Sequence, residues 1–204
     1  MPEESGGKKL ADFTRTMIPN KATWPKFPAG LDSYGISGKG QYRSTLQVGR
    51  TWEEEYPAIK WNNASHRGFM AYINSLFRER TLFTIDHYHL QTPLGTISGG
   101  GVINGATQTG SAITVTAITG TLKQGDIIKL PGLAHIFDII ADCSNGATSL
   151  PISPPVFTGG SPTNGQAITY TGVKFQCVID ELTMPMADKS LVYKGLKIKF
   201  RETP

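Results

Sequence analysis

Charged side chains are scarce in the middle of this chain, between Gly95 and Gly172. The five that occur there are Lys123, Asp126, Lys129, Asp138 and Asp142. So few cations argue against a nucleic-acid groove in this stretch, because phosphate binding requires a denser set of basic side chains. The stretch also contains three Asn-Gly pairs, at 104–105, 145–146 and 164–165, which tolerate the positive φ angles of tight hairpin turns. We therefore expect a small β-domain here.

Cysteines and long apolar runs are also scarce. The two cysteines, Cys143 and Cys177, lie far apart in sequence, and we expect two buried thiols rather than a disulfide. No apolar run is long enough to cross a bilayer, so we expect no membrane insertion. Residues 1–9 are polar and lack the apolar segment of a signal peptide, from which we expect synthesis in the cytoplasm.

Signatures of catalysis and cofactor binding are missing. No Gly-x-Ser-x-Gly motif is present, and the glycine-rich stretches match neither a phosphate loop nor a dinucleotide-binding fingerprint. Glu53, Glu54 and Glu55 could supply a catalytic carboxylate, but we interpret them as a solvated loop. We therefore expect no enzyme activity, no catalytic residue and no cofactor.

The histidines do not predict a metal site. His87 and His89 flank Tyr88, so on a strand the two imidazoles would share one face. Two ligands do not make a zinc site, and no cysteine or carboxylate lies at ligand spacing from them. We expect ordinary strand histidines and no bound metal.

The chain is mildly basic, with a formal net charge of +4. Its one group of basic side chains lies near the end of the chain, at Lys194, Lys197, Lys199 and Arg201. These residues alternate with apolar ones along a predicted strand. We interpret them as a solvated strand face, because a nucleic-acid-binding arm would need a denser cluster interleaved with aromatics.

One helix is predicted, from Ser65 to Arg80. Five large apolar residues fall on one continuous face of it: Phe69, Tyr72, Ile73, Leu76 and Phe77. Asn63 or Ser65 can cap its start by accepting a free backbone N–H. Because Gly68 and Asn74 are poor helix formers, we expect packing of the apolar face to hold the helix in place.

Period-two alternation predicts strands on both sides of the middle stretch, at 45–52, 173–179 and 196–201. Two further strands are expected at 58–61 and 82–88. Strands before residue 90 and strands after residue 172 both need sheet partners. We therefore expect one discontinuous domain, residues 41–94 and 173–204, with the helix packed on its sheet. Residues 1–40 are rich in Gly and Pro, and we expect an extended N-terminal arm.

The middle stretch, residues 95–172, is then an inserted second domain. Five short strands are predicted in it, at 112–118, 126–130, 135–142, 148–152 and 166–171, which suits a small closed barrel. Asn145-Gly146 is expected to close a hairpin between the third and fourth of them. Pro151, Pro154 and Pro155 argue against a central strand in their neighbourhood.

The order of these features resembles that of a known family. Gly49-Arg50-x-Trp52 and Tyr56-Pro57 precede the helix, which ends at Phe77-Arg78. The insert carries Thr121-Leu122-Lys123-Gln124-Gly125-Asp126-Ile127-Ile128 and Ile152-Ser153-Pro154-Pro155, and the chain closes with residues 193–202. Over about residues 41–203 the sequence is similar to the distal tail proteins of long, non-contractile phage tails, in the subgroup with a small inserted domain.

This resemblance implies a mainly β (α+β) fold. It implies a β-sandwich with one packed helix, and an inserted small β-barrel similar to an oligonucleotide/oligosaccharide-binding (OB) fold. It also implies a structural virion protein at the tail tip, made in the host cytoplasm. Such proteins form a homo-oligomeric ring, usually hexameric, between the tail tube protein and the baseplate hub protein. DNA would pass through the ring's channel without specific binding.

Four aromatic residues are candidate interface anchors in such a ring: Trp24, Trp52, Tyr56 and Trp61. Trp52 and Trp61 could equally be core residues. An alternative function is a carbohydrate-binding module for host-surface adhesion, in which Tyr170, Phe157 and His135 of the insert would stack on sugar rings.

Overall fold

A computed structural model describes residues 10–26, 32–34, 41–43, 49–157, 160–187 and 192–203. Over these residues the fold is mainly β with a single α-helix, as predicted. Half of the predicted N-terminal arm, and half of the strand predicted at 45–52, lie outside the described residues. The part of the arm that is described contains short strands: β1 (Ala11–Asp12), β2 (Lys21–Ala22) and β3 (Asp32–Tyr34), the last paired with β4 (Gln41–Arg43).

The chain divides into two compact units. The outer unit takes in the residues up to 24, together with 52–85 and 176–201. The middle unit takes in 25–51, 86–175 and the residues from 202 onward. Its main segment is therefore longer at both ends than the predicted insert, residues 95–172, and it also includes Arg50 and Glu202.

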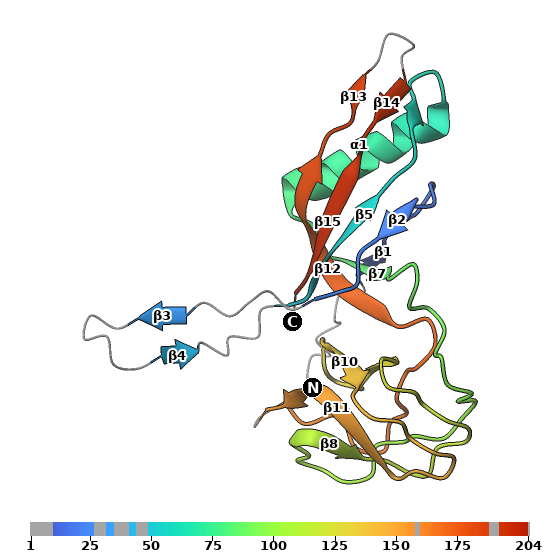
Figure 1. Cartoon of the computed structure of the whole chain (residues 1–204), viewed down its shortest axis with the longest axis vertical. Helices are drawn as coiled ribbons and strands as arrows, with labels where there is room; N and C mark the ends of the chain where they lie inside the picture. Colours follow the sequence, from blue (N-terminus) through green and yellow to red (C-terminus); the bar gives the residue numbers. More distant parts are fainter. Residues whose placement is uncertain are drawn as a thin grey trace, which may run out of the picture. The chain divides into compact units, whose positions relative to one another are not determined.

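The outer unit is built on a six-stranded sheet whose strand order is β1-β7-β12-β15-β5-β2. Its four inner strands are β5 (Thr51–Glu55), β7 (Phe83–Asp86), β12 (Lys174–Thr183) and β15 (Lys197–Glu202). Strands from the two ends of the chain therefore lie side by side, as the cyan β5 and the red β15 show (Figure 1). A second sheet has the order β13-β14-β6, formed by β6 (Ile59–Lys60), β13 (Met186–Ala187) and β14 (Val192–Lys194).

Helix α1 spans Ala64–Glu79, which confirms the predicted helix. Asn63 caps it, because its Oδ1 accepts hydrogen bonds from the backbone N–H groups of Ser65 (2.9 Å) and His66 (3.2 Å). Phe69, Ile73 and Leu76 are buried, so three of the five residues on the predicted face form its packed core. The helix ends at Arg80, which adopts the left-handed conformation with φ of 50°.

Aromatic rings fill the space between α1 and the large sheet. Phe200 of β15 lies 5.3 Å from Trp52 and 5.5 Å from Phe13, measured between ring centroids. Phe13 also lies 6.3 Å from Phe69 of α1. These contacts join the N-terminal segment, the helix and the C-terminal strand into one core, because aromatic rings bury a large area and pair in tilted or edge-on arrangements.

The basic residues of β15 lie on the solvent side of the large sheet. Ile198 and Phe200 are buried, whereas Lys197, Lys199 and Arg201 alternate with them and are partly exposed. Lys197 pairs with Glu53 at 3.3 Å, and Lys199 and Arg201 both pair with Asp180. This ion-paired surface confirms the prediction of a solvated strand face for these three residues, whereas Lys194 lies on a different strand, β14.

The middle unit contains a four-stranded antiparallel sheet with the order β8-β11-β10-β9. Its strands are β8 (Gly110–Thr114), β9 (Ile127–Lys129), β10 (Ile136–Ile139) and β11 (Ser149–Val156). Three isolated bridges continue it: Lys129 to Thr169, Ala167 to Val102, and Ile103 to Val115. These bridges connect β9 back to the end of β8, so the sheet closes on itself through four strands and two shorter segments. An OB-fold barrel has five strands, so the OB-like part of the prediction is not confirmed.

The prediction that the prolines exclude a central strand was wrong for β11. It lies inside the sheet between β8 and β10, although it contains Pro151, Pro154 and Pro155. The ladder tolerates them because β10 pairs with it only at Ile152 and Ser153, and because the pairing with β8 is interrupted between Pro151 and Val156. The carbonyl of Pro151 still accepts a hydrogen bond from the N–H of Ile140 at 3.1 Å. The predicted hairpin between β10 and β11 is confirmed.

The core of the middle unit is aliphatic. Ile113, Val115, Ile139 and Leu150 are each 1% exposed or less, and Phe137 is the one aromatic ring among the fully buried residues of this cluster. Cys143 belongs to the same core, and Cys177 is buried in the outer unit. Both are free thiols, as predicted.

Candidate docking surface

The outer unit has an open groove between residues 67–74 of α1 and the small sheet β13-β14-β6. Its volume is about 430 Å³. The side chains that line it are mostly apolar: Ile59, Trp61, Arg67, Met70, Ala71, Asn74, Met184, Pro185 and Tyr193. Monomeric proteins rarely leave such a concave apolar surface uncovered, and uncovered ones are commonly binding sites.

The turn between β6 and α1 positions Trp61 at the rim of this groove. The backbone N–H of Lys60 donates to Nδ1 of His66 at 2.9 Å, and the N–H of Asn63 donates to the carbonyl of Lys60 at 3.1 Å. Trp61 lies within this tight turn and remains 50% exposed. The turn therefore fixes the position of an indole ring that the core does not cover.

Two neighbouring side chains hold the Trp61 ring in place. The Tyr193 ring lies 5.6 Å from it, because β14 pairs with β6 and sets Tyr193 opposite Ile59. From the helix side, the guanidinium of Arg67 lies 5.3 Å from the indole centroid, within cation–π distance. Trp61 is thus a preformed aromatic anchor with a cation against its face, and Trp, Tyr and Arg are the residues most enriched at binding hot spots.

Methionines extend the apolar surface beyond the aromatic rings. Met70 projects from α1 into the groove, and Met184 lines the opposite wall with 50% exposure. Met186, on the edge strand β13, is 82% exposed. Flexible thioether side chains adapt to different partner shapes, which makes them common at binding surfaces.

The four candidate anchors divide into two pairs. Trp61 and Trp24 are exposed, at 50% and 58%, and so remain available for binding. Trp52 and Tyr56 are 1% and 2% exposed, so neither is an exposed anchor, and for Trp52 the alternative interpretation as a core residue is confirmed. Their rings pack inside the aromatic core of the outer unit, against Phe200 and Phe69 respectively.

The acidic stretch before Tyr56 also differs from the prediction. Glu53, Glu54 and Glu55 belong to strand β5 rather than to a solvated loop, and Glu54 is fully buried. Arg15 pairs with Glu54 at 2.5 Å, and the Tyr56 hydroxyl donates to it at 2.7 Å. Burial, reinforced by the Glu54 carboxylate, raises the pKa of Tyr56 far above its ordinary value. This triad ties the N-terminal segment to the sheet.

A second buried polar cluster lies in the middle unit. Arg50 donates to the Asp138 carboxylate (3.1 Å) and to the Ile136 carbonyl (2.8 Å). Glu202 accepts hydrogen bonds from the backbone N–H groups of Ile136 (3.0 Å) and Arg50 (3.2 Å). Burial raises the pKa of Asp138, although Arg50 opposes the shift. Gly49 is required beside this cluster, because a Cβ there would lie 1.8 Å from the Glu202 carbonyl oxygen.

The histidines do not assemble a metal site. Strand β7 ends at Asp86, so His87 and His89 are not on a strand as predicted, and His87 is 1% exposed. The Nδ1 atom of His87 accepts from the backbone N–H of His89 at 3.3 Å. Within the described residues, no group of three or more His, Cys, Asp or Glu side chains has a metal-binding arrangement.

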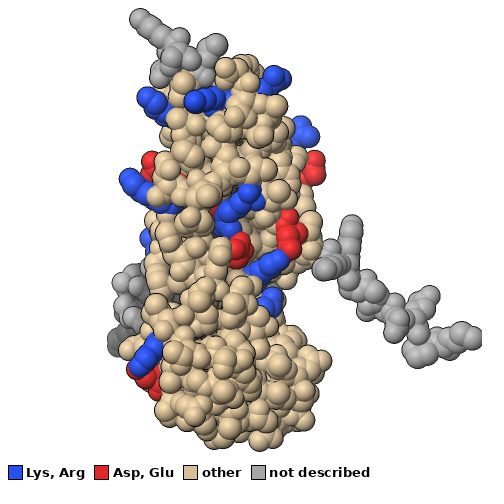
Figure 2. Space-filling model, turned by 90° about the vertical axis from the view of Figure 1, so that its right-hand side faces the viewer, with Lys and Arg blue, Asp and Glu red and all other residues tan. Residues whose placement is uncertain are grey.

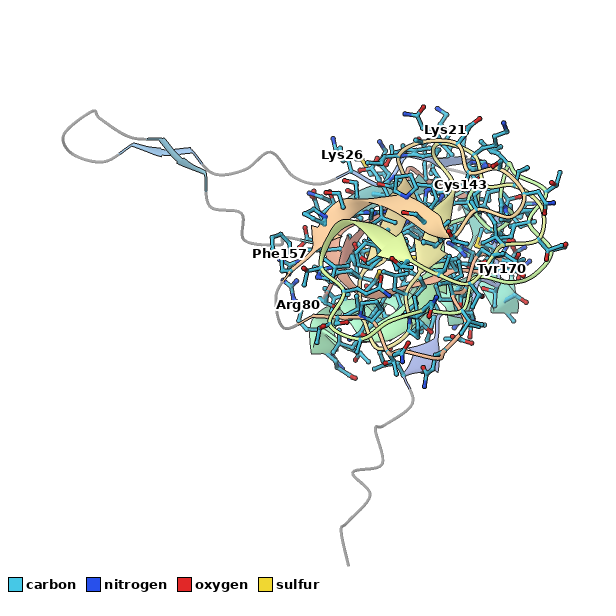
Figure 3. The ribbon with its side chains drawn as sticks, turned by 90° about the horizontal axis from the view of Figure 1, so that it is seen from below. Lys21, Lys26, Arg80, Cys143, Phe157 and Tyr170 are labelled. Carbon is cyan, nitrogen blue, oxygen red and sulfur yellow. The ribbon has the colours of Figure 1, made fainter. Side chains whose placement is uncertain are left out.

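The residues proposed for sugar stacking do not form one platform. Phe157 is 46% exposed, whereas Tyr170 is partly buried against the barrel core. The two labelled side chains lie on opposite sides of the middle unit (Figure 3). His135 is half-buried, and burial lowers its pKa. Lys123, one of the few cations of this unit, pairs with Asp142 at 2.6 Å.

The groove was only partly visible in the sequence. Trp61 was identified as a candidate anchor, but Arg67, Met184 and Tyr193 were not, because they come from distant segments and share no spacing. Two methionines around Pro185, both exposed, were the one available signal.

No helix in the described segments is long and apolar enough to span a membrane. Comparison with known protein families finds no family that matches the chain, and comparison with curated proteins finds no match.

Proposed function

We propose that this chain is a structural virion protein that forms a ring at the distal end of a phage tail tube and connects the tube to the baseplate hub. The observation that carries the proposal is the exposure of large apolar side chains at separate places on a folded outer unit. Trp61 and Met184 line the groove, whereas Ile18 (66% exposed) and Trp24 (58% exposed) flank the edge strand β2.

A ring places specific demands on its subunit. Head-to-tail contacts use two different surfaces of each copy, and a tail-tip ring must also bind proteins on either side of it. A subunit with several uncovered apolar anchors meets this demand. The split arrangement of the chain, with a largely continuous middle unit between segments of an outer unit, is the layout that the family resemblance implies. In this proposal the ring is hexameric, and DNA passes through its channel.

The mass of the full chain in solution tests this proposal. We expect mass photometry and negative-stain electron microscopy of the purified protein to show a closed ring with six times the 22.1 kDa mass of one chain. A monomer at micromolar concentration, with no rings on the grid, would count decisively against the proposed function.

A matched pair of variants sharpens this test. Trp24→Ala removes an exposed anchor of the outer unit and is expected to shift the population toward monomers. Ile140→Ala removes an exposed apolar side chain (44% exposed) from the middle unit and is expected to leave the ring intact. An intact ring in Trp24→Ala would show that Trp24 makes no essential ring contact, and loss of the ring in Ile140→Ala alone would assign the contacts to the middle unit.

A further inference from the structure

We propose that the groove beside Trp61 binds an acidic segment of a different protein, which inserts a large apolar side chain between α1 and β14 while its carboxylates meet the basic residues around the groove. The inference goes beyond ring formation. It rests on the proposed function in one respect: other surfaces make the contacts between copies, so the groove is the site for a different protein.

The shape and lining of the groove favour a peptide side chain as the inserted group. A volume of about 430 Å³ lies within the range of pockets that hold ligands. Met70 and Met184 face it from opposite walls, an arrangement that adapts to Leu, Phe or Met of a partner. Asn74 on α1 supplies one polar group at the edge.

The charged side chains that the structure describes beside the groove are basic. Arg67 lines it, Lys60 precedes Trp61 on β6, and Lys194 lies on β14. On the face drawn in Figure 2, the coloured charged side chains at the end of the outer unit that holds β13, β14 and the start of α1 belong to Lys and Arg. The one acidic residue on the helix, Glu79, is about 18 Å further along its axis than Arg67. Charge complementarity therefore calls for an acidic partner.

A different protein is favoured over a second copy as the source of that chemistry. Most of the acidic side chains that the structure describes are already engaged, within their own chain, with basic side chains or with backbone N–H groups. In the outer unit, Glu54 pairs with Arg15, Glu53 with Lys197, Glu55 with Lys21, Glu79 with Arg78, and Asp180 and Glu181 with Lys199. In the middle unit, Asp126 accepts backbone N–H groups, and Asp138, Asp142 and Glu202 are held as described above.

A nucleic acid fits the groove less well than an acidic peptide. Single-stranded nucleic acids follow a continuous basic track with aromatic stacking platforms. Here Arg67 is the single charged residue of the lining, and it already lies against the face of Trp61. The methionine walls offer apolar contact and no phosphate-binding group.

The test uses the full-length protein and short fluorescein-labelled peptides, followed by fluorescence polarisation. The probe peptide alternates Asp and Glu with Leu and Phe. Two matched peptides replace its acids by Lys, or its Leu and Phe by Ala, and a labelled single-stranded DNA serves as a polyanion without apolar side chains. We expect the probe peptide to bind at least about tenfold more tightly than the other three, and its affinity to fall as salt rises.

Three variants then locate the site. Trp61→Ala and Arg67→Glu are each expected to weaken binding of the probe peptide about tenfold or more. Lys21→Glu changes an exposed cation on β2, outside the groove, and is expected to leave the affinity unchanged. Circular dichroism and thermal melting verify that each variant is folded, which separates loss of binding from loss of structure.

The outcomes separate this inference from the proposed function. Equal binding of DNA, or binding unaffected by Trp61→Ala and Arg67→Glu, would overturn the inference. Loss of the ring in both groove variants would assign the groove to contacts between copies, which overturns the inference and leaves the proposed function standing. A monomeric wild-type protein that binds the probe peptide at Trp61 would support the inference and contradict the proposed ring.

Discussion

The outer and middle units bury cores of different chemistry. The outer unit packs aromatic rings from three separate stretches of chain, including Phe13, Phe69 and Phe200. The middle unit packs mainly Ile, Leu and Val from one largely continuous stretch. Each aromatic contact buries a large area, which helps to hold the separate chain segments of the outer unit together. The β-branched side chains of the middle unit suit its short strands. The two units therefore depend on different residues for stability.

The tryptophans offer a direct way to separate the two units experimentally. All three lie in the outer unit: Trp24, Trp52 and Trp61. Tryptophan fluorescence therefore reports on the unfolding of the outer unit, whereas far-ultraviolet circular dichroism reports on both.

The largest expected effect comes from Phe200→Ala. Its ring contacts Phe13, Trp52 and Phe83, and none of its surface is exposed. Truncation should lower the free energy of unfolding of the outer unit by about 3–5 kcal/mol. Denaturant unfolding followed by tryptophan fluorescence measures this change, with the half-buried Phe77→Ala as a milder control. A shift below about 1 kcal/mol would contradict the aromatic core described for this unit.

Leu150→Ala should act on the middle unit instead. Leu150 on β11 is 0% exposed within the aliphatic cluster, so its truncation should cost about 2–4 kcal/mol. We expect circular dichroism to show an earlier transition while the tryptophan transition stays in place. Leu94→Ala, at an exposed position (76%), provides the control. If the tryptophan transition moved equally, the two units would unfold as one.

Asn63→Ala should have a smaller effect, confined to the outer unit. It removes the side-chain oxygen that caps α1, which should cost about 1 kcal/mol. The neighbouring exposed residue provides the control variant, Asn62→Ala, which should leave stability unchanged. Tryptophan-detected unfolding measures both. Equal stabilities of the two variants would argue against the cap.

The smallest effect is a pH dependence of the middle unit. Burial lowers the pKa of His135 below 6.5, so the folded protein binds fewer protons here than the unfolded chain. The resulting stability is present above pH 6.5 and is lost progressively as the pH falls below it. Unfolding followed by circular dichroism between about pH 7.5 and pH 5 should show this loss. His135→Asn should flatten the profile, whereas the exposed-site variant His89→Gln should retain it.

The regular parts of the fold were predictable because they depend on local pattern. The helix, its Asn63 cap and the alternation along β12 and β15 all follow from residue spacing and capping chemistry. The pairing of β10 with β11 followed from the Asn145-Gly146 turn. In each case the signal lay within a few consecutive residues.

The errors have a common physical origin in contacts between distant residues. Arg15 reaches the buried Glu54 from the N-terminal segment, and β11 can lie inside the sheet because its pairing with β8 is interrupted where Pro154 and Pro155 occur. Likewise, no local feature separates the buried Trp52 from the exposed Trp61. The groove is lined by β6, α1, β14 and the segment between β12 and β13, so the sequence identified one of its anchors and not the surface.

Cryo-electron microscopy of the purified full-length protein shows both the assembly and its contact surfaces, and is therefore the decisive experiment. We expect closed rings in which the outer units touch one another and the groove at Trp61 faces away from those contacts. A field of single subunits, or rings held together by the middle units alone, would contradict this expectation.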